Sequence, residues 1–265
     1  HLTAFLAGVK TRVHSDHGHG GDAQDGLNKK NNFIRKVSSF FINDYVVVSQ
    51  DLMDWVTRVV KVKPQRLHLI QNGVDVPDSL ANIKMKVPTS PVICTVGRLD
   101  PVKNQTLLLN AFKIVHDKSA NARLKIVGDG PERENLEREA AQLKVTQFVD
   151  FMGYREDVRE QLITSDVFVL SSHYEAMPMT ILEAMAIGCP VVTTDVGGIR
   201  HFVDDTYVTY SSPGKAEELA EHLLLSLQYL PEQQEKIKKS FELVKSSYSL
   251  QAMAARYTSI YYNKN

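Results

Sequence analysis

The sequence is poor in the features that would assign it to a special class of protein. It has two cysteines, too few for a disulfide scaffold, and both Cys94 and Cys189 lie in apolar segments where reduced, buried thiols are expected. Its 31 Lys and Arg balance 31 Asp and Glu, which excludes the whole-chain basic field of a nonspecific nucleic-acid binder. No apolar run reaches about 18 residues, so no membrane-spanning helix is predicted. The opening residues do not have the pattern of a signal peptide, and we expect a cytoplasmic protein.

Strand-like and helix-like segments alternate along nearly the whole chain. The strand-like runs are apolar on both faces, as parallel strands covered by helices require. This alternation with short loops predicts an α/β fold with a doubly wound parallel sheet. The predicted strands cover residues 45–49, 66–70, 92–96, 124–127, 148–151, 167–170 and 191–194, with helices at about 105–117, after Pro131 and at about 158–164.

The length indicates more than one domain but less than two full ones. A chain of 265 residues is about 1.8 times a domain of about 150 residues. Residues 72–91 hold three prolines and no sustained period, which predicts a linker. We therefore expect a partial first domain at 1–80, a linker at 81–91, a complete α/β domain at 92–245 and a C-terminal segment at 246–265. In the last segment, 249–262 places apolar residues on one helical face, which must pack on another element.

Two glutamates, Glu175 and Glu183, stand eight residues apart in "HYEAMPMTILEAMAIGCPVV". Pro178 suits a first helical turn and Gly188 a C-terminal cap, so a helix is predicted over 178–187. Glu175 then lies at the carboxyl end of the preceding strand, where ligands of open α/β sheets collect. Glu183 lies within the helix.

A ligand with both an anion and hydroxyl groups fits this arrangement. The first N–H groups of the predicted helix, those of Met179 and Thr180, favour an anion, whereas carboxylates accept hydrogen bonds from sugar hydroxyls. The alternative is that Glu175 only complements the helix N-terminus and Glu183 only lies on a solvated face. The apolar residues on either side of Glu183 argue against a wholly solvated face.

Two cations follow the strand at 92–96 in "TVGRLDPVKNQTLLLNAF". Arg98 and Lys103 lie in a loop that opens a helix, where Arg as a planar fork and Lys as a point charge can hold a diphosphate. A pair of surface charges is the alternative. The diphosphate interpretation gains weight if this loop shares a crevice with the glutamate pair.

A Gly-x-Gly stands between a strand and a helix in "LKIVGDGPERENLE". A dinucleotide fingerprint needs a third glycine where Arg133 stands, which argues against an NAD-dependent enzyme. A turn beside a nucleotide and a purely structural turn both remain open.

Histidines and acids crowd a glycine-rich loop after a strand-like segment in "RVHSDHGHGGD". A metal cluster, a catalytic loop with one working histidine and a polar surface loop are all open. The histidine spacing matches no firm zinc pattern, so we expect no metal site and favour the catalytic loop. The residues concerned are His14, Asp16, His17, His19 and Asp22.

Residues 27–41 carry four basic side chains and no acid, and their apolar residues fall along one side of a helix. The segment could therefore lie on an anionic bilayer, as a peripheral contact on the inner face of the membrane. A core-facing helix with a solvated basic face is the more common explanation of such a pattern. The basic residues are Lys29, Lys30, Arg35 and Lys36, and the apolar ones are Phe33, Val37, Phe40 and Phe41.

Together these motifs resemble the retaining, nucleotide-sugar-dependent glycosyltransferases of family 4, whose GT-B fold has two facing Rossmann-like domains. The resemblance is densest from "IQNGVDV" at 70–76 to "VGGIRHFV" at 196–203. It includes "VGRLDPVKN", "LKIVGDGPERENLE", "FMGYREDVREQL" and "SDVFVLSSHYEAMPMTILEAMAIGCPVVTTDVGG". The opening section is similar to bacterial sugar transferases of polysaccharide clusters. The resemblance implies an acceptor-side domain at 1–80, a nucleotide-sugar domain at 92–245, and a helix at 249–262 that packs back on the first domain.

The resemblance also implies a role for each matching residue. Arg98 and Lys103 would hold the donor diphosphate, and Glu183 would bond the ribose hydroxyls. Glu175 would bind the transferred sugar. His17 best matches the family's active-site histidine, with His14 as the alternative, so we take His17 and Glu175 as the catalytic pair.

The remaining residues implied by the resemblance surround the donor. Tyr154 and Arg155 would border the base. Backbone at Ala176, Met177, Met179 and Thr180 would line the sugar-phosphate site. Family members often have glycine where Ala176 stands, and alanine is small enough for close backbone approach.

The implied reaction moves a sugar with retention from a UDP- or GDP-sugar to a glycan or lipid-linked acceptor in polysaccharide biosynthesis, without a metal or other cofactor. Family members open with a strand and a glycine-rich loop, and the first residues here do not match them. The chain is therefore either part of a longer transferase or a truncated module that binds a nucleotide sugar or a partner without turnover.

Overall fold

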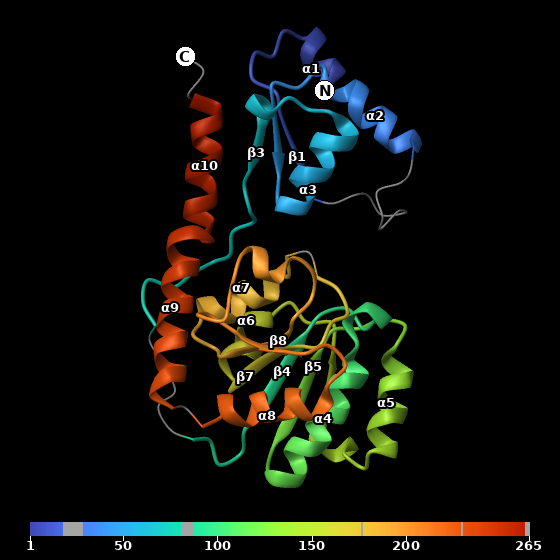
Figure 1. Cartoon of the computed structure of the whole chain (residues 1–265), viewed down its shortest axis with the longest axis vertical. Helices are drawn as coiled ribbons and strands as arrows, with labels where there is room; N and C mark the ends of the chain where they lie inside the picture. The colour runs from blue at the N-terminus through green and yellow to red at the C-terminus, as the bar shows by residue number, and fades with distance from the viewer. Residues whose placement is uncertain (18–28, 81–86, 176, 229, 263–265) are drawn as a thin grey trace. The chain divides into compact units, whose positions relative to one another are not determined.

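The computed structural model describes residues 1–17, 29–80, 87–175, 177–228 and 230–262 (Figure 1). The chain divides into two units, one formed by His1–Gly73 with Tyr248–Asn265 and the other by Val74–Ser247. The divisions fall between residues 73 and 74 and between residues 247 and 248, so residues 74–91, which include the predicted linker, belong to the second unit. No helix within the described ranges is long and apolar enough to cross a membrane.

The first unit is built on a small parallel sheet with the order β1-β2-β3. Its strands are β1 (Val13–Asp16), β2 (Asp44–Val47) and β3 (Leu67–Leu69). Its helical segments are α1 (Leu2–Leu6), α2 (Lys29–Ser39), α3 (Gln50–Trp55), the π-helical η1 (Val56–Val60), the short η2 (Pro64–Arg66) and α10 (Leu250–Tyr262).

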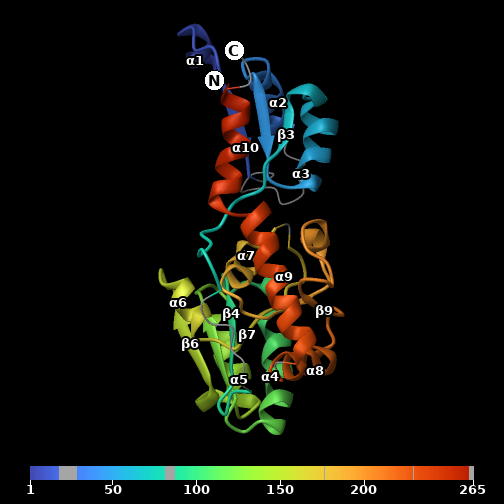
Figure 2. The same cartoon turned by 90° about the vertical axis from the view of Figure 1, so that its left-hand side faces the viewer.

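Strand β2 is buried on both faces. Because successive side chains of a strand point to opposite sides, its residues pack into two different clusters. Tyr45 and Val47 pack into a core with residues of α3 and η1. Val46 points the other way and packs with Ile70 and with Ile260 of α10. Helix α10 therefore covers the second face of this sheet, as Figure 2 shows.

The second unit has the larger sheet, with the order β6-β5-β4-β7-β8-β9 and every pair parallel. This order matches the doubly wound nucleotide-binding sheet, in which the direction of winding reverses between the first and fourth strands. Here those strands are β4 and β7. The strands are β4 (Val92–Val96), β5 (Arg123–Val127), β6 (Val149–Gly153), β7 (Val167–Leu170), β8 (Val191–Thr194) and β9 (Thr209–Ser211).

Helices cover this sheet and supply its core. Apolar residues of α4, α5 and α8 join those of the strands in one continuous hydrophobic cluster. The helical segments are η3 (Pro101–Lys103), α4 (Gln105–Lys118), α5 (Arg133–Gln142), η4 (Thr146–Phe148), α6 (Val158–Ile163), α7 (Met179–Ala186), η5 (Gly197–His201), α8 (Ala216–Ser226) and α9 (Pro231–Ser247). Strand β9 and helices α8 and α9 have no counterpart among the elements predicted from the sequence.

The Gly-x-Gly turn after β5 has a structural explanation. A Cβ added to Gly128, whose φ is +134°, would lie 2.0 Å from the carbonyl oxygen of Gly97. A Cβ added to Gly130 would lie 2.3 Å from the carbonyl oxygen of Leu99. Both glycines therefore let the loops after β4 and β5 touch backbone to backbone, and this supports the structural interpretation of the turn.

Two local expectations need correction. Pro178 precedes the helix in an extended conformation, with φ −72° and ψ 115°, and does not form its first turn, while Gly188 has the expected positive φ of +75°. Helix α2 is not core-facing: Ser39 is its buried residue, and Phe33 and Phe40 are 67% and 74% exposed. Of its predicted apolar side, Phe41, beyond the helix end, packs on Phe5 with ring centroids 5.4 Å apart.

Candidate functional site

The candidate site lies where β4, β7 and β8 end. These strands are neighbours in the sheet and parallel, so their carboxyl ends meet at one edge. The loop after β4 carries Arg98 and Lys103, and the loop after β7 carries Glu175. The edge includes the reversal of winding between β4 and β7, which is the usual ligand position in open α/β sheets.

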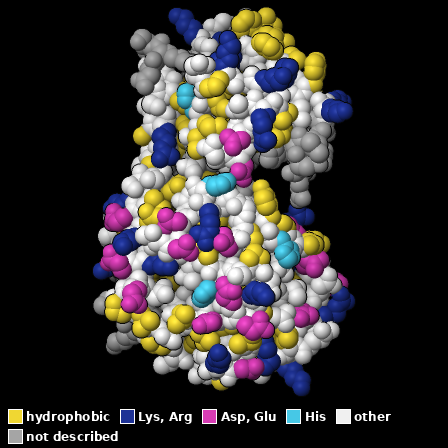
Figure 3. Space-filling view, viewed as in Figure 1, with side chains coloured by type: hydrophobic (Ala, Val, Ile, Leu, Met, Phe, Trp, Pro, Cys, Tyr) yellow, Lys and Arg dark blue, Asp and Glu magenta, His cyan; other side chains and the backbone are white. Residues whose placement is uncertain are grey.

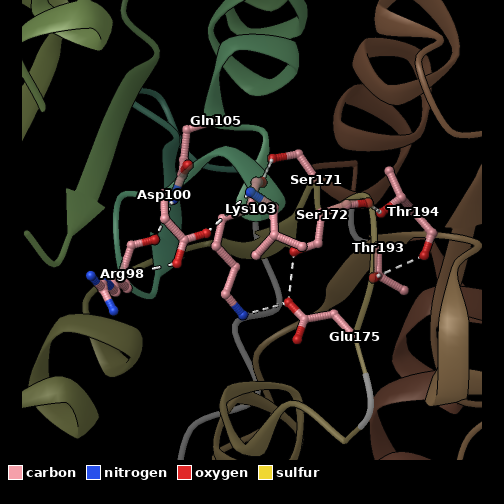
Figure 4. A network of polar contacts seen from close by, with 10 residues as sticks. Arg98, Asp100, Lys103, Gln105, Ser171, Ser172, Glu175, Thr193 and Thr194 are labelled. Carbon is pink, nitrogen blue, oxygen red and sulfur yellow. Dashed lines mark hydrogen bonds and ion pairs between the residues drawn. The ribbon is translucent and has the colours of Figure 1, made fainter. Parts of the chain in front are cut away.

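Lys103 and Glu175 form an ion pair across this edge. The Lys103 Nζ lies 2.7 Å from Glu175 Oε1, with side-chain exposures of 23% and 8% (Figure 4). Ser172 Oγ donates a second hydrogen bond, of 2.6 Å, to the same oxygen. The structure therefore brings together two of the residues predicted from the sequence, and holds the carboxylate in a largely buried position.

The end of β8 and the turn that follows it position Glu175 and its loop. The Gly198 N–H donates to the Glu175 carbonyl oxygen at 2.7 Å, and Thr194 Oγ1 donates to the Ser172 carbonyl oxygen at 2.7 Å. A Cβ added to Gly197, whose φ is +54°, would lie 2.1 Å from the Glu175 carbonyl oxygen. The turn after β8 therefore needs glycine because it packs directly on the backbone of Glu175.

The short helix η3 positions Lys103. Asp100 caps it by accepting a 3.1 Å hydrogen bond from the Val102 N–H. The Val102 carbonyl accepts from the His173 N–H at 2.7 Å, and the Lys103 carbonyl accepts from Ser171 Oγ at 3.1 Å. The loops after β4 and β7 are thus tied together on both sides of the ion pair.

Arg98 stands apart from the ion pair. Its side chain is 73% exposed and approaches Asp100 at 3.9 Å. Figure 4 shows it pointing away from Glu175. Arg98 and Lys103 come from the same loop, but their side chains do not converge on one point as the predicted diphosphate site requires.

Glu183 is half-buried on α7, and burial raises its pKa above the ordinary value. Among the described residues no side chain or backbone group pairs with its carboxylate, which makes its position costly unless a ligand uses it. The N–H groups of Met179 and Thr180, at the start of the same helix, have no acceptor in the described part of the chain. Met177 lies just before them, half-buried, and Ala176 lies outside the described residues.

Tyr154 and Arg155 follow β6, which is separated from β4 by β5. Tyr154 is 77% exposed, leaving its ring free for stacking. Arg155 makes two hydrogen bonds of 2.7 Å to Asp157, and these raise the pKa of the guanidinium and lower that of the carboxyl. Its guanidinium is therefore already engaged at the surface.

The histidine loop belongs to the first unit. His17 is exposed just after the end of β1, and its Nε2 lies 3.2 Å from Ser15 Oγ. His14 is half-buried, and burial lowers its pKa; its Nδ1 lies 3.0 Å from His1 Nε2. Asp16 is buried and accepts a 2.9 Å hydrogen bond from Tyr45 Oη.

His19 and Asp22 lie outside the described residues, so the structure does not test their part of the predicted loop. In the part of the chain that the structure does describe, no three His, Cys, Asp or Glu side chains gather as metal ligands would.

Sequence reasoning missed Ser172, which shares Oε1 of Glu175 with Lys103. A signal was available, because Ser171 and Ser172 directly follow the buried strand β7. Polar residues at that point of a parallel strand face the same edge as the ligand site. Thr194 occupies the equivalent place just inside the end of β8.

Comparison with known proteins identifies the family. The sequence profile of the family described as glycosyl transferases group 1 matches residues 79–242, most of the second unit. The chain belongs to this family. A putative glycosyltransferase of Bacillus subtilis, EpsF, is 30% identical over 207 residues, which are 73% of this chain and 53% of EpsF. The Escherichia coli UDP-Gal:alpha-D-GlcNAc-diphosphoundecaprenol alpha-1,3-galactosyltransferase is 28% identical over 78% of this chain and 57% of its own length.

Solved structures share the fold. HepE from Anabaena, determined with UDP and glucose, has a TM-score of 0.78 at 19% identity and covers 97% of this chain and 73% of its own. TarM from S. aureus has a TM-score of 0.75 at 18% identity, covering 95% of this chain and 51% of its own. The expected α/β fold of GT-B type, with Rossmann-like parallel sheets, is confirmed. The chain spans about half the length of the two curated relatives.

Proposed function

We propose that this glycosyltransferase-family chain takes part in moving a sugar, with retention, from a nucleoside-diphosphate sugar to a glycan or lipid-linked acceptor. The observation that carries the proposal is the Lys103–Glu175 ion pair at the carboxyl ends of β4 and β7. It joins a cation suited to phosphate and a carboxylate suited to sugar hydroxyls at one point. This pairing is what a ligand with adjacent phosphate and sugar requires.

The donor diphosphate would be held by charge and backbone rather than by a metal. Lys103 has further protons to donate, the exposed Arg98 side chain has room to turn toward a ligand, and the first N–H groups of α7 have no acceptor among the described residues. Stabilising the developing negative charge of the leaving diphosphate is electrostatic catalysis. Glu183 would accept the ribose hydroxyls, and Tyr154 with Arg155 would border the base.

The acceptor would attack the anomeric carbon from the side of the leaving group, which gives retention, and His17 is the catalytic histidine that the family resemblance implies. UDP is the first candidate for the nucleotide because HepE was determined with UDP, and GDP is the alternative. The name of the E. coli relative, which includes a diphosphoundecaprenol-linked sugar, supports a lipid-linked or glycan acceptor in polysaccharide biosynthesis.

Nucleotide binding to the intact chain tests the proposal. We expect UDP or GDP to bind by calorimetry, and Lys103→Ala to weaken binding by about 1–3 kcal/mol, the scale of one charge-assisted hydrogen bond. Lys113→Ala is the matched control, because Lys113 pairs with Asp117 on the exposed side of α4 and should leave affinity unchanged. Absence of binding to the wild type, or equal affinity in Lys103→Ala, would reject the site. NADH binding without UDP or GDP binding would favour a dehydrogenase instead.

We also propose that α2 contacts an anionic membrane surface. Phe33 and Ile34 of α2 and Phe40 just after it are more than half exposed, and the helix carries three exposed lysines, Lys29, Lys30 and Lys36, and no acid, while its fourth cation, Arg35, pairs with Asp16. Figure 3 shows hydrophobic side chains together with Lys and Arg in the upper part of the view, which holds α1 and α2. Apolar side chains that enter the headgroup region and cations that attract anionic lipid are the two components of interfacial binding.

A further inference from the structure

Glu175 and Lys103 are each only partly satisfied by their ion pair. Oε1 of Glu175 receives both the Lys103 ammonium and the Ser172 hydroxyl, whereas Oε2 has no partner in the described part of the chain. The ammonium carries three protons and makes one hydrogen bond within the same ranges. A ligand can therefore bind both groups without separating them.

This geometry fixes how close a bound phosphate must come to a carboxylate. If Lys103 holds the donor diphosphate, as the proposed function requires, phosphate and Glu175 become two acceptors on one ammonium. Each acceptor of a charge-assisted hydrogen bond lies about 2.8 Å from the nitrogen, so the two oxygens are at most about 5.6 Å apart. The Glu175 side chain is 8% exposed, so solvent screens this repulsion poorly.

The repulsion is not equal for donor and product. A nucleotide sugar has an esterified terminal phosphate, whereas the nucleoside diphosphate left after transfer has a terminal phosphate with an additional ionisable oxygen, whose second pKa is about 6. At neutral pH the product therefore places more negative charge beside Glu175. The product also lacks the sugar hydroxyls that Oε2 could accept.

We infer that Glu175 determines the preference of the site for a nucleotide sugar over the spent nucleoside diphosphate, by holding a carboxylate on the lysine that binds the diphosphate. The inference rests on the proposed function and adds a second role for the same residue. Glu175 binds the sugar of the donor, and its charge lowers the affinity for the product. The site can thereby take up donor and release product with the same lysine.

The test compares two ligands on variants of the intact chain. Calorimetry with UDP and UDP-glucose, or with GDP and GDP-mannose if guanosine is the preferred base, gives both dissociation constants for the wild type and Glu175→Gln. We expect Glu175→Gln to bind UDP about tenfold more tightly than the wild type, equivalent to about 1.4 kcal/mol. Its affinity for UDP-glucose should be lower than that of the wild type or unchanged. Glu175→Asp and Ser172→Ala keep the charge and should not tighten UDP.

The outcomes separate this inference from the proposed function. If the wild type binds none of these nucleotides, the proposed function fails. If the wild type binds them but Glu175→Gln binds UDP no more tightly than the wild type, the discrimination by charge is wrong and the proposed function stands. Circular dichroism checks that each variant is folded, and Glu175→Ala removes the same charge if the Gln variant does not fold.

Discussion

At the scale of single residues, the candidate site contains one side chain that folding alone does not favour. Glu183 is half-buried among apolar neighbours on α7, and no described group pairs with its carboxylate. Removing a charge from water without a partner costs stability, and such positions concentrate at functional sites. We therefore expect Glu183 to lower stability while it improves binding.

Glu183→Gln should make the protein more stable at neutral pH and weaken nucleotide binding by about tenfold. Because burial raises the folded-state pKa of Glu183, the folded chain holds the proton more strongly than the unfolded chain. Stability is then lost as pH rises from the unfolded value, about 4.3, through the folded one, and the variant lacks this loss.

Urea unfolding of both proteins from about pH 4 to about pH 8 measures this difference. The two curves should converge at the acidic end and separate above it, with the variant more stable. A variant that is less stable at neutral pH would contradict the prediction, because it would mean that Glu183 has a stabilising partner in the folded chain.

At the scale of elements, glycines decide how closely neighbouring loops pack. Gly128→Ala should destabilise the second unit by about 3 kcal/mol or more, because the new Cβ would meet the Gly97 carbonyl at 2.0 Å in a backbone region that disfavours side chains. Gly214→Ala is the matched control: φ is +75° and no atom lies within 4 Å of the added Cβ, so strain alone should cost about 1 kcal/mol.

Urea unfolding followed by far-UV circular dichroism measures both variants, since the single tryptophan, Trp55, lies in the other unit. Equal losses in the two variants would show that loop contact at Gly128 contributes nothing beyond backbone strain.

The elements themselves were largely predictable, because buried parallel strands have distinctive apolar runs. Strands β4, β7 and β8 were located to the residue, whereas β9 was missed because Thr209–Ser211 is three residues long and has no apolar run. The Gly-x-Gly turn stayed ambiguous in sequence because the atom that requires Gly128 belongs to Gly97, in a different loop. Contacts between distant segments are set by the sheet order, which local patterns do not contain.

The same reason limits prediction of the site. Lys103 and Glu175 could each be placed after a strand, but their contact depends on β4 lying beside β7. Arg98 could not be placed, because an exposed side chain on a loop takes its position from solvent and ligand rather than from packing. Ser172 was overlooked because serine after a strand is common and its role appears only through Glu175.

At the scale of the whole molecule, the apolar face of α2 predicts binding to anionic vesicles. The chain should sediment with vesicles that contain phosphatidylglycerol and stay in solution with pure phosphatidylcholine. Replacing Phe33 and Phe40 together by Ser should reduce vesicle binding at least tenfold, because each replacement removes apolar surface that the bilayer would otherwise bury. Tyr262→Ser, at a residue of α10 that is 71% exposed, is the control. Binding that is equal on both lipids, or unchanged in the double variant, would contradict the membrane contact.

The first unit is assembled from the two separated ends of the described chain, whereas Val74–Ser247 is one continuous stretch. During synthesis the ribosome therefore releases β1–β3 early and α10 only after the whole second unit. Until α10 has been synthesised, Val46 and Ile70 cannot pack against Ile260, so one apolar face of the small sheet stays exposed to solvent. The second unit can therefore complete its fold before the last helix of the first unit has been synthesised. The order of translation thus makes the second unit the earlier one to mature.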